Sequence, residues 1–548
     1  MILFFDSYAI EIQISGSWID FTPDVLPSPR PHWNVGIMNN SALSRIGDPE
    51  NFSFSLNNGA GNSAGLAGYF TPGHANCMSG WRSGLPVHLY FVFEGLKRYK
   101  YYGHITPDGI TVAPGVLGAR SVDVVCHGFM AQAANHNLNL PEFVENKRID
   151  EVVPLIIGNM PTPPLATEYH QGIDTFPTVF DTVRSMTTAL AEFNKLAMSE
   201  YGYIYTKGDG SSGETLVVEA RDTRNSIGAN TEIPLDKLNS GFLLREDGGY
   251  LLREDGGKIV RHEAAAPSYS NIALSNMKTG YGKNLANQIK ATLYPRRVDA
   301  AATTILFVTQ SRIAVDPGET KTGIRGVYRD PNGAASYVSG RDMAIPEAGT
   351  DYTAYANSDG TGAPLISNLV LTYVYGTEAV EYTLQNIGGT RMWVWIQAKG
   401  RGIYIYDSIS SVAEDETSEL QYGVYPLSID MKYQSDPTRG DVFANFTLLK
   451  NKDPRMKIDS YPILANRDGQ SMYGFLCLEP GSRAHFSEPQ SAVDDDYFIC
   501  GYEAEIVAGK YVIWAPVLKS ATDDSWYEGT GWVLGASQLE IDTTLAFG

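Results

Sequence analysis

A chain of 548 residues is long enough for about three to five domains of ordinary size, each with its own core. Its 54 glycines, its 32 tyrosines and a charged fraction of only 19% favour a mainly β, turn-rich fold. A formal net charge of −20 argues against a surface that grips nucleic acid, because binding to phosphates depends on Lys and Arg.

The first region, residues 1–117, is predicted to contain short strands separated by turns. Residues 52–56 alternate apolar and polar side chains, as a strand with one solvated face does. Residues 23–31 are rich in Pro, and residues 57–68 are rich in Gly, Asn and Ser, so both are predicted to be loops. We interpret this region as a small barrel or sandwich.

The second region, residues 118–265, is predicted to be an α+β domain that contains a helix over residues 178–198. Thr178 follows Pro177 and could cap the first turn. After Gly202 the sequence predicts a hairpin of two strands. The helix is indicated by six apolar residues at alternating spacings of four and three, which places them on one face: Val179, Val183, Met186, Leu190, Phe193 and Ala197.

An octapeptide occurs twice in succession within residues 241–257, with Phe242 in the first copy replaced by Tyr250 in the second, and each copy ends in an Asp-Gly turn signal. The simpler interpretation, which we favour, is a surface β-ribbon. The alternative is an arm that docks on a neighbouring subunit by strand addition. The candidate contact residues of that arm are Phe242, Leu244, Tyr250 and Leu252.

The third region, residues 266–420, is predicted to be a β-sandwich-like domain, because strands alternate with many turns. The fourth, residues 421–548, opens with a strand at 425–431. A short helix should follow Asp436 and Pro437, and strands should fill the rest. One face of that helix is predicted to contain Val442, Phe443, Phe446 and Leu449.

No catalytic constellation is found, and we expect no catalytic, cofactor-binding or metal-binding residues. The nine histidines are scattered, without the spacing of a metal site. Cys126 and His127 are neighbours on a predicted strand and should point to opposite faces, which disfavours a catalytic pair. The four cysteines, far apart in sequence, are interpreted as small buried hydrophobic residues.

Three further patterns have a functional and a simpler interpretation. The acidic runs 494–496 and 523–524 could bind a cation, but solvated loop charge is favoured because the ligand alternation of a calcium loop is missing. Residues 357–360 begin like such a loop but lack its closing Glu. Trp393 and Trp395 could form a platform for a sugar, and one face of a sheet core explains them equally well.

The start of the chain has no basic segment followed by a long apolar one. We therefore expect neither a signal peptide nor a membrane span. The protein is expected to be made and kept in the cytoplasm, at least until assembly.

Seven stretches, in their order along most of the chain, carry a resemblance to a known family. They are residues 48–58, 69–73, 188–221, 241–256, 316–320, 427–434 and 532–539. Together they resemble the tail hub proteins of long-tailed bacteriophages, also known as minor tail or tail-tip proteins, which are related in fold to the myophage baseplate hub.

The resemblance implies a mainly β, multi-domain fold with two tube-like β-barrels, at residues 1–117 and 421–548, plus the α+β domain and the inserted β-domain. It also implies a homotrimer at the tail tip of the virion, in which six barrels from three chains form a ring. The implied partners are the distal tail protein, the tape measure protein and a central fibre or tip protein. DNA would pass through the bore, and an acidic wall would repel its phosphates.

Some members of that family carry a lysozyme or peptidase domain, which is not recognised in this sequence, so an enzyme is not expected. Two alternatives stay open. The aromatic-rich residues 266–420 could belong to a receptor- or carbohydrate-binding protein of the tail tip. A cell-wall hydrolase is the less favoured alternative.

Overall fold

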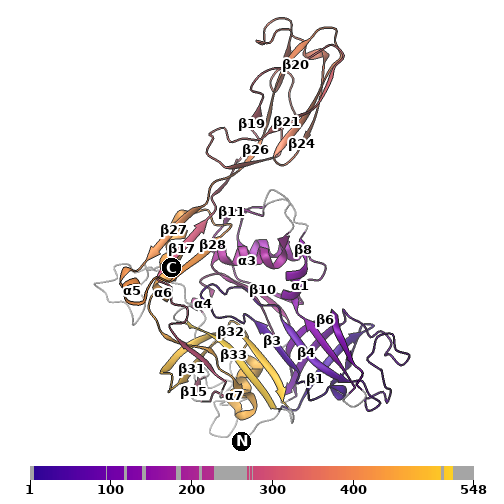
Figure 1. The fold of residues 1–548 in the computed structure, drawn as a ribbon, viewed down its shortest axis with the longest axis vertical. Coiled ribbons are helices and arrows are strands. Elements are labelled where there is room, and N and C mark those ends of the chain that lie inside the picture. Colours follow the sequence, from indigo (N-terminus) through magenta and orange to yellow (C-terminus); the bar gives the residue numbers. More distant parts are fainter. Residues whose placement is uncertain are drawn as a thin grey trace, which may run out of the picture.

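The computed structural model is mainly β and consists of a broad body and a lobe that projects from it (Figure 1). It describes residues 5–93, 95–115, 120–138, 144–180, 187–208, 213–226, 268–270, 272–274, 276–507 and 511–521. Within these residues no helix is both long enough and apolar enough to cross a membrane.

The body is built on a 14-stranded sheet that takes strands from both ends of the chain. The main path of this sheet runs in the order β16-β29-β33-β32-β3-β4-β7-β6-β5-β1-β2. Its N-terminal strands are β1 (Ser7–Ile14), β2 (Ser17–Asp20), β3 (His32–Gly36), β4 (Asn51–Asn57), β5 (Pro86–Phe93), β6 (Leu96–Ala113) and β7 (Ser121–His127), with the short helix η1 (Thr22–Asp24). Its later strands are β15 (Ser268–Ser270), β16 (Lys278–Tyr281), β29 (Met456–Ser460), β30 (Ile463–Leu464), β31 (Arg483–Glu488), β32 (Val493–Val507) and β33 (Tyr511–Ser520), with η3 (Ala465–Arg467) and α7 (Gly469–Cys477).

Strand β3 joins the two ends of the chain, because it pairs with β4 on one edge and with β32 on the other. Trp33 lies opposite Phe52 of β4 and opposite Ala504 of β32. The regions predicted as separate barrels, residues 1–117 and 421–548, therefore share one sheet. Strand β7, which the sequence places in the second region, pairs with β4 and β6 of the first. Strands such as β3 and β32 are far apart in the sequence, so no local sequence pattern indicates that they pair.

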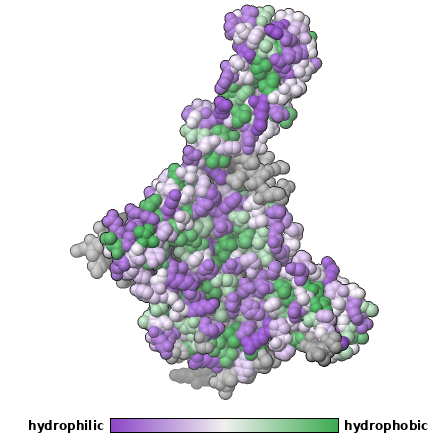
Figure 2. All heavy atoms as spheres, in the orientation of Figure 1, coloured by the Kyte–Doolittle hydropathy of each residue, from purple (hydrophilic) through white to green (hydrophobic). Residues whose placement is uncertain are grey.

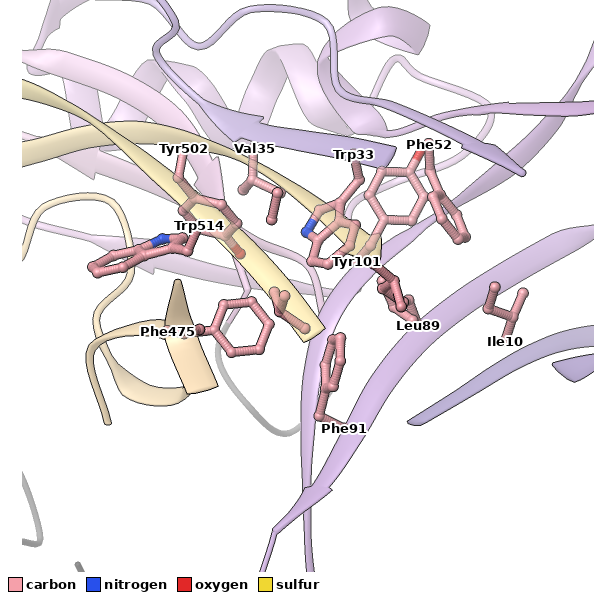
Figure 3. Packing of buried hydrophobic residues seen from close by; sticks show 14 of the residues in the cluster. Ile10, Trp33, Val35, Phe52, Leu89, Phe91, Tyr101, Phe475, Tyr502 and Trp514 are labelled. Atoms are coloured by element: carbon pink, nitrogen blue, oxygen red, sulfur yellow. The ribbon is translucent and has the colours of Figure 1, made fainter. Parts of the chain in front are cut away.

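One hydrophobic core also spans the shared sheet (Figure 3). The ring centroids of Trp33 and Phe475 lie 6.3 Å apart, and those of Phe91 and Phe475 lie 4.9 Å apart. Trp33 and Phe91 come from N-terminal strands, whereas Phe475 comes from α7. Because each buried side chain of this size contributes roughly 1.5–3 kcal/mol, the two ends of the chain stabilise each other.

The central region packs helices beside small sheets, in agreement with the predicted α+β character. The predicted hairpin is confirmed, since β13 (Tyr203–Lys207) and β14 (Thr215–Glu219) pair antiparallel. The main helix, α3 (Ala189–Glu200), buries Phe193, Leu196 and Ala197 in the core of this region. The other elements are β8 (Asn137–Leu138), β9 (Val144–Lys147), β10 (Ala166–Tyr169), β11 (Phe176–Val179), β12 (Thr187–Thr188), α1 (Phe129–Asn135), α2 (Ile149–Ile157) and α4 (Thr223–Ser226).

The prediction of a helix over residues 178–198 is wrong at residues 178–179 and 187–188, which belong to strands. Residues Phe176–Val179 form β11, which pairs antiparallel with β9, and residues 181–186 lie outside the described part. Thr178 and Val179 are β-branched, so a strand suits them as well as a helix, and pairing with β9 decides between the two. Val179 is buried as predicted, but from a strand. The residue that caps the helix is Thr188, whose hydroxyl accepts a hydrogen bond from the Ala191 amide at 3.2 Å.

Replacing Thr188 with alanine is expected to lower the free energy of unfolding by about 1 kcal/mol, because the first turn of α3 loses its capping oxygen. Thr188→Ser keeps that oxygen and should stay close to the wild type. Urea unfolding followed by circular dichroism measures both variants. An equal loss in both would show that the capping bond contributes nothing.

A three-stranded sheet connects the body to the lobe. In it β17 (Gln288–Leu293) lies between β27 (Ile409–Glu414) and β28 (Pro426–Met431). The helices beside it are α5 (Glu416–Tyr422) and α6 (Pro437–Asn451). The prediction of a helix after Asp436 and Pro437 is confirmed, and the Asp436 side chain caps it. Phe443 and Phe446 of α6 are buried as expected, but Leu449 is 60% exposed.

The projecting lobe is a sandwich of two sheets around one core. In one sheet the long strand β26 (Met392–Ile405) pairs with β18 (Arg296–Val298), β19 (Thr304–Val308), β20 (Ile313–Val315), β22 (Tyr337–Arg341) and β23 (Tyr352–Tyr355). The other sheet has the order β21 (Thr320–Val327), β25 (Ala379–Asn386), β24 (Leu369–Tyr375), and η2 (Ile366–Asn368) precedes β24. The sandwich thus occupies the middle of the predicted 266–420 region, whereas β15 and β16 from the start of that region belong to the body.

Candidate functional site

The residues singled out in the sequence do not converge on one site. The candidate contact residues Phe242, Leu244, Tyr250 and Leu252 lie outside the described residues, as does the acidic run 523–524, so the docking arm stays a prediction. Trp393 and Trp395 lie side by side on the outer face of the lobe sheet, because Met392, Val394 and Ile396 between and beside them fill the core.

Cys126 and His127 point to opposite faces of β7, as predicted. The Cys126 side chain is fully buried, and burial raises the pKa of its thiol far above the ordinary value. All four cysteines are free thiols, of which Cys126 and Cys500 are buried. Cys126 therefore behaves as a small core residue and not as a nucleophile.

Two carboxylates of the acidic run 494–496 surround an imidazole. His485 Nδ1 lies 3.0 Å from Asp496, and its Nε2 lies 3.0 Å from Asp494. These bonds raise the pKa of His485 even though partial burial opposes the shift. Asp495 points away and accepts a hydrogen bond from the Ser520 hydroxyl. In the described part of the chain, no group of three or more His, Cys, Asp or Glu residues is arranged to hold a metal ion.

What the structure does bring together is a set of buried charges at the contacts between regions. The first is the ion pair of Lys100 on β6 with Glu479, 379 residues later in the sequence. The Lys100 side chain is completely buried, and Tyr502 Oη lies 3.4 Å from the second Glu479 oxygen. Burial raises the pKa of Glu479, and the charge of Lys100 opposes that shift. This pair ties the N-terminal strands to the C-terminal part of the body.

A second group of buried charges ties the central region to the sheet that supports the lobe. Arg221 lies 2.8 Å from Asp174 and 3.4 Å from Glu200, and both the Arg221 and the Glu200 side chains are completely buried. The Gln434 amide, from the segment between β28 and α6, donates to Asp174 at 3.0 Å. Burial raises the pKa of Glu200 to about 7, although the Arg221 charge opposes the shift.

A third group holds two carboxylates against the start of α1. Glu50 accepts from the Met130 amide at 3.2 Å, and Glu214 accepts from the Phe129 amide at 3.1 Å. Burial, followed by the nearby Glu214 charge, raises the pKa of Glu50 to about 8, and burial raises that of Glu214 to about 7. Glu50 Oε1 has no hydrogen-bond partner among the described residues, so the protonated, uncharged form suits this site.

The regions also meet around a small cavity of about 20 Å³, which is room for roughly one water molecule. The Arg45 guanidinium lies 3.6 Å from the centre of the Tyr201 ring and donates to the Tyr201 carbonyl at 2.8 Å. Lys519 donates to the Tyr203 hydroxyl at 2.8 Å. Lys450 and Lys457 also line the cavity. It is too small for a substrate, and the arrangement fixes the position of one region against the next.

Comparison with known proteins gives matches among solved structures only. No protein-family model matches the chain, and no curated protein matches it. The chain is similar to the tail protein from Neisseria meningitidis MC58, with a TM-score of 0.43 and 9% identity over 95% of this chain and 100% of the other.

Two further matches have similar extent. The prophage MuSo2 43 kDa tail protein from Shewanella oneidensis has a TM-score of 0.42 and 8% identity, covering 94% of this chain and 99% of the other. The prophage tail protein gp18 from Listeria monocytogenes EGD-e has a TM-score of 0.38 and 9% identity, covering 93% and 94%. All three TM-scores are below 0.5, and likeness at that level does not define what this chain does.

Proposed function

We propose that this chain is a structural protein of a phage tail and that three copies form the hub of the tail tip. In this role it would join the tail tube and the distal tail protein to a central fibre or tip protein. The tape measure protein would be a further partner, and no catalytic step is assigned to the chain. Its place would be the virion, after assembly in the host cytoplasm.

The observation that carries the proposal is the pairing of β3 with β32. A subunit that supplies two neighbouring parts of a ring must hold them at a fixed angle. Here the N-terminal and C-terminal strands are joined by backbone hydrogen bonds, by a shared core and by the buried pair of Lys100 and Glu479. These contacts support the proposal that the N-terminal and C-terminal regions of one chain act as two rigidly joined parts of a ring, as the sequence resemblance implies.

The charge of the chain supports the passage of DNA through such a ring without binding. With a net charge of −20, its surface repels phosphates on average. We infer that acidic side chains line the bore. A ring whose bore is lined mainly by Lys and Arg would contradict this inference.

The proposal predicts a trimer in solution or on the tail. Light scattering coupled to size exclusion should give about three times the chain mass of 59.9 kDa, and negative-stain images should show a three-fold ring with an axial hole. A compact monomer under all conditions, including in the presence of the distal tail protein, would overturn the hub assignment.

A second candidate function is favoured by one observation on the lobe. Trp393 and Trp395 lie on its outer face, and in register Tyr355 is opposite Trp393 and Thr353 is opposite Trp395. Aromatic faces beside a hydroxyl group suit stacking against sugar rings. Binding of the full chain on a glycan array, lost in Trp393→Ala, would favour a carbohydrate-binding role.

A further inference from the structure

A groove opens on one side of the projecting lobe, between the edges of its two sheets. Its volume is about 560 Å³, in the range of peptide and ligand sites. Its walls include Ile305 and Val308 of β19, Arg325 and Val327 of β21, and Arg329 just beyond β21. Both strands are visible in the upper part of Figure 1.

The groove lies along strand edges that other strands leave uncovered. Among the described residues β19 pairs with β26 only, and β21 pairs with β25 only. The two edges meet where the Arg329 amide donates to the Leu306 carbonyl at 2.8 Å and where Gly326 lies against the Phe307 ring. An open edge presents backbone donors and acceptors to any chain that lies along it.

The surface of this groove is partly apolar. Ile305 is 42% exposed, Val308 is 44% exposed and Val327 is 48% exposed, although each belongs to a strand of a well-packed sandwich. Figure 2 shows hydrophobic and hydrophilic residues side by side on the visible face of the lobe. Apolar side chains gathered along an open strand edge are typical of a contact surface.

The groove also carries two arginines that form no ion pair with a described residue. Arg325 and Arg329 are exposed, and neither forms an ion pair with a described residue. Glu381 is opposite Arg325 in register, yet the two make no ion pair. The remaining acid in the wall, Asp330, accepts from the amides of its own loop, at Asn332, Ala334 and Ala335.

The balance of charge in the lobe is unusual for this acidic chain. Residues 296–406 contain ten basic and ten acidic residues, so the net charge of −20 comes entirely from the rest of the protein. Several acids of the lobe are already paired, including Asp316 with Arg391 and Asp351 with Lys399. The two arginines in the groove are therefore available to form ion pairs with carboxylates of another chain.

We propose that this groove binds an extended, acidic peptide segment of a partner protein, which adds along the open edge of β21. Arg325, Val327 and Arg329 alternate with the buried Gly326 and Tyr328, so they face the same way. At about 3.3 Å per residue the two arginines are roughly 13 Å apart. A peptide strand paired with this segment places two carboxylates, four residues apart, next to the two arginines. The peptide residue midway between them lies next to Val327 and should be apolar. The peptide therefore has the pattern acidic-x-apolar-x-acidic.

The test uses the full chain and a labelled synthetic heptapeptide, Thr-Glu-Thr-Val-Thr-Glu-Thr, with fluorescence anisotropy as the readout. The peptide should bind saturably, and replacing its two Glu residues with Lys should abolish binding. The double variant Arg325→Glu/Arg329→Glu should bind the peptide roughly tenfold more weakly or worse, because two attractions become repulsions.

Two controls make the result specific to this groove. The double variant Arg82→Glu/Arg120→Glu changes the net charge equally at exposed positions of the N-terminal region and should bind the peptide as the wild type does. A peptide methylated on alternate backbone nitrogens should bind weakly, because strand addition needs those donors.

Three outcomes would overturn the proposal. They are no saturable binding, equal loss in both double variants, and saturable binding of an acidic oligosaccharide that the Glu peptide cannot displace. The hub assignment would survive each of them, since the mass and ring shape of the assembly are measured separately.

Discussion

Replacing Lys100 with methionine is expected to cost about 3–5 kcal/mol of folding free energy, because it leaves the buried Glu479 carboxylate without its counter-charge. Lys100 is completely buried, and among the described residues Tyr502 is the other side chain that hydrogen-bonds to the Glu479 carboxylate. Since this pair joins the two ends of the chain, the loss should appear in the unfolding of the body. Urea unfolding followed by tryptophan fluorescence reports it through Trp33 and Trp514, both of which lie in the shared core.

The matched control is the double variant Lys100→Met/Glu479→Leu. It removes both charges and replaces them with apolar side chains of similar size, so most of the lost stability should return. If the double variant is as unstable as Lys100→Met, the cost comes from packing and not from an unpaired charge.

Replacing Glu50 with glutamine is expected to stabilise the protein at alkaline pH. The pKa of Glu50 is raised from 4.5 to about 8 by burial and by Glu214, so the fold prefers the protonated acid. This contribution to stability is complete below pH 4.5, declines as the pH rises, and is lost above about pH 8. A neutral glutamine escapes that loss, and we expect a gain of roughly 2–4 kcal/mol at pH 9, after allowing for the buried amide.

Melting temperatures measured between pH 4 and pH 9 test this expectation. The wild type should lose stability across the range from 4.5 to 8, whereas Glu50→Gln should have a flatter profile. Glu503→Gln, at an exposed position of β32, is the control and should follow the wild type. Parallel profiles for Glu50→Gln and the wild type would show that Glu50 is already ionised in the fold.

Local patterns in the sequence predicted the local structure well. The hairpin after Gly202, the helix after Asp436 and the β-sandwich of the lobe each follow from spacing and turn residues that lie close together in the chain. The start of α3 was misplaced for a physical reason. The apolar spacing from Val179 onward fits a helix, but β9 supplies a strand partner for residues 176–179, and only the tertiary structure reveals it.

The buried charges could not be predicted in the same way. Lys100 stands among tyrosines on a strand, and Glu479 follows an apolar helix, so each is a charged residue in a hydrophobic setting, which is a weak signal of burial. Their pairing depends on a contact across 379 residues. The same holds for Arg221 and Gln434, which meet at Asp174 only once the central region and the lobe support are folded together.

The chain enters and leaves the lobe at one place. Arg296 at the beginning of β18 is opposite Ile405 at the end of β26, so the first and last residues of the sandwich are neighbours on paired strands. An insertion whose ends lie this close can be exchanged for another of different size without rerouting the chain around it. The lobe can therefore change independently of the body. Its surface residues can be replaced to suit a new partner, while the residues of the shared sheet remain constrained by the packing of the body.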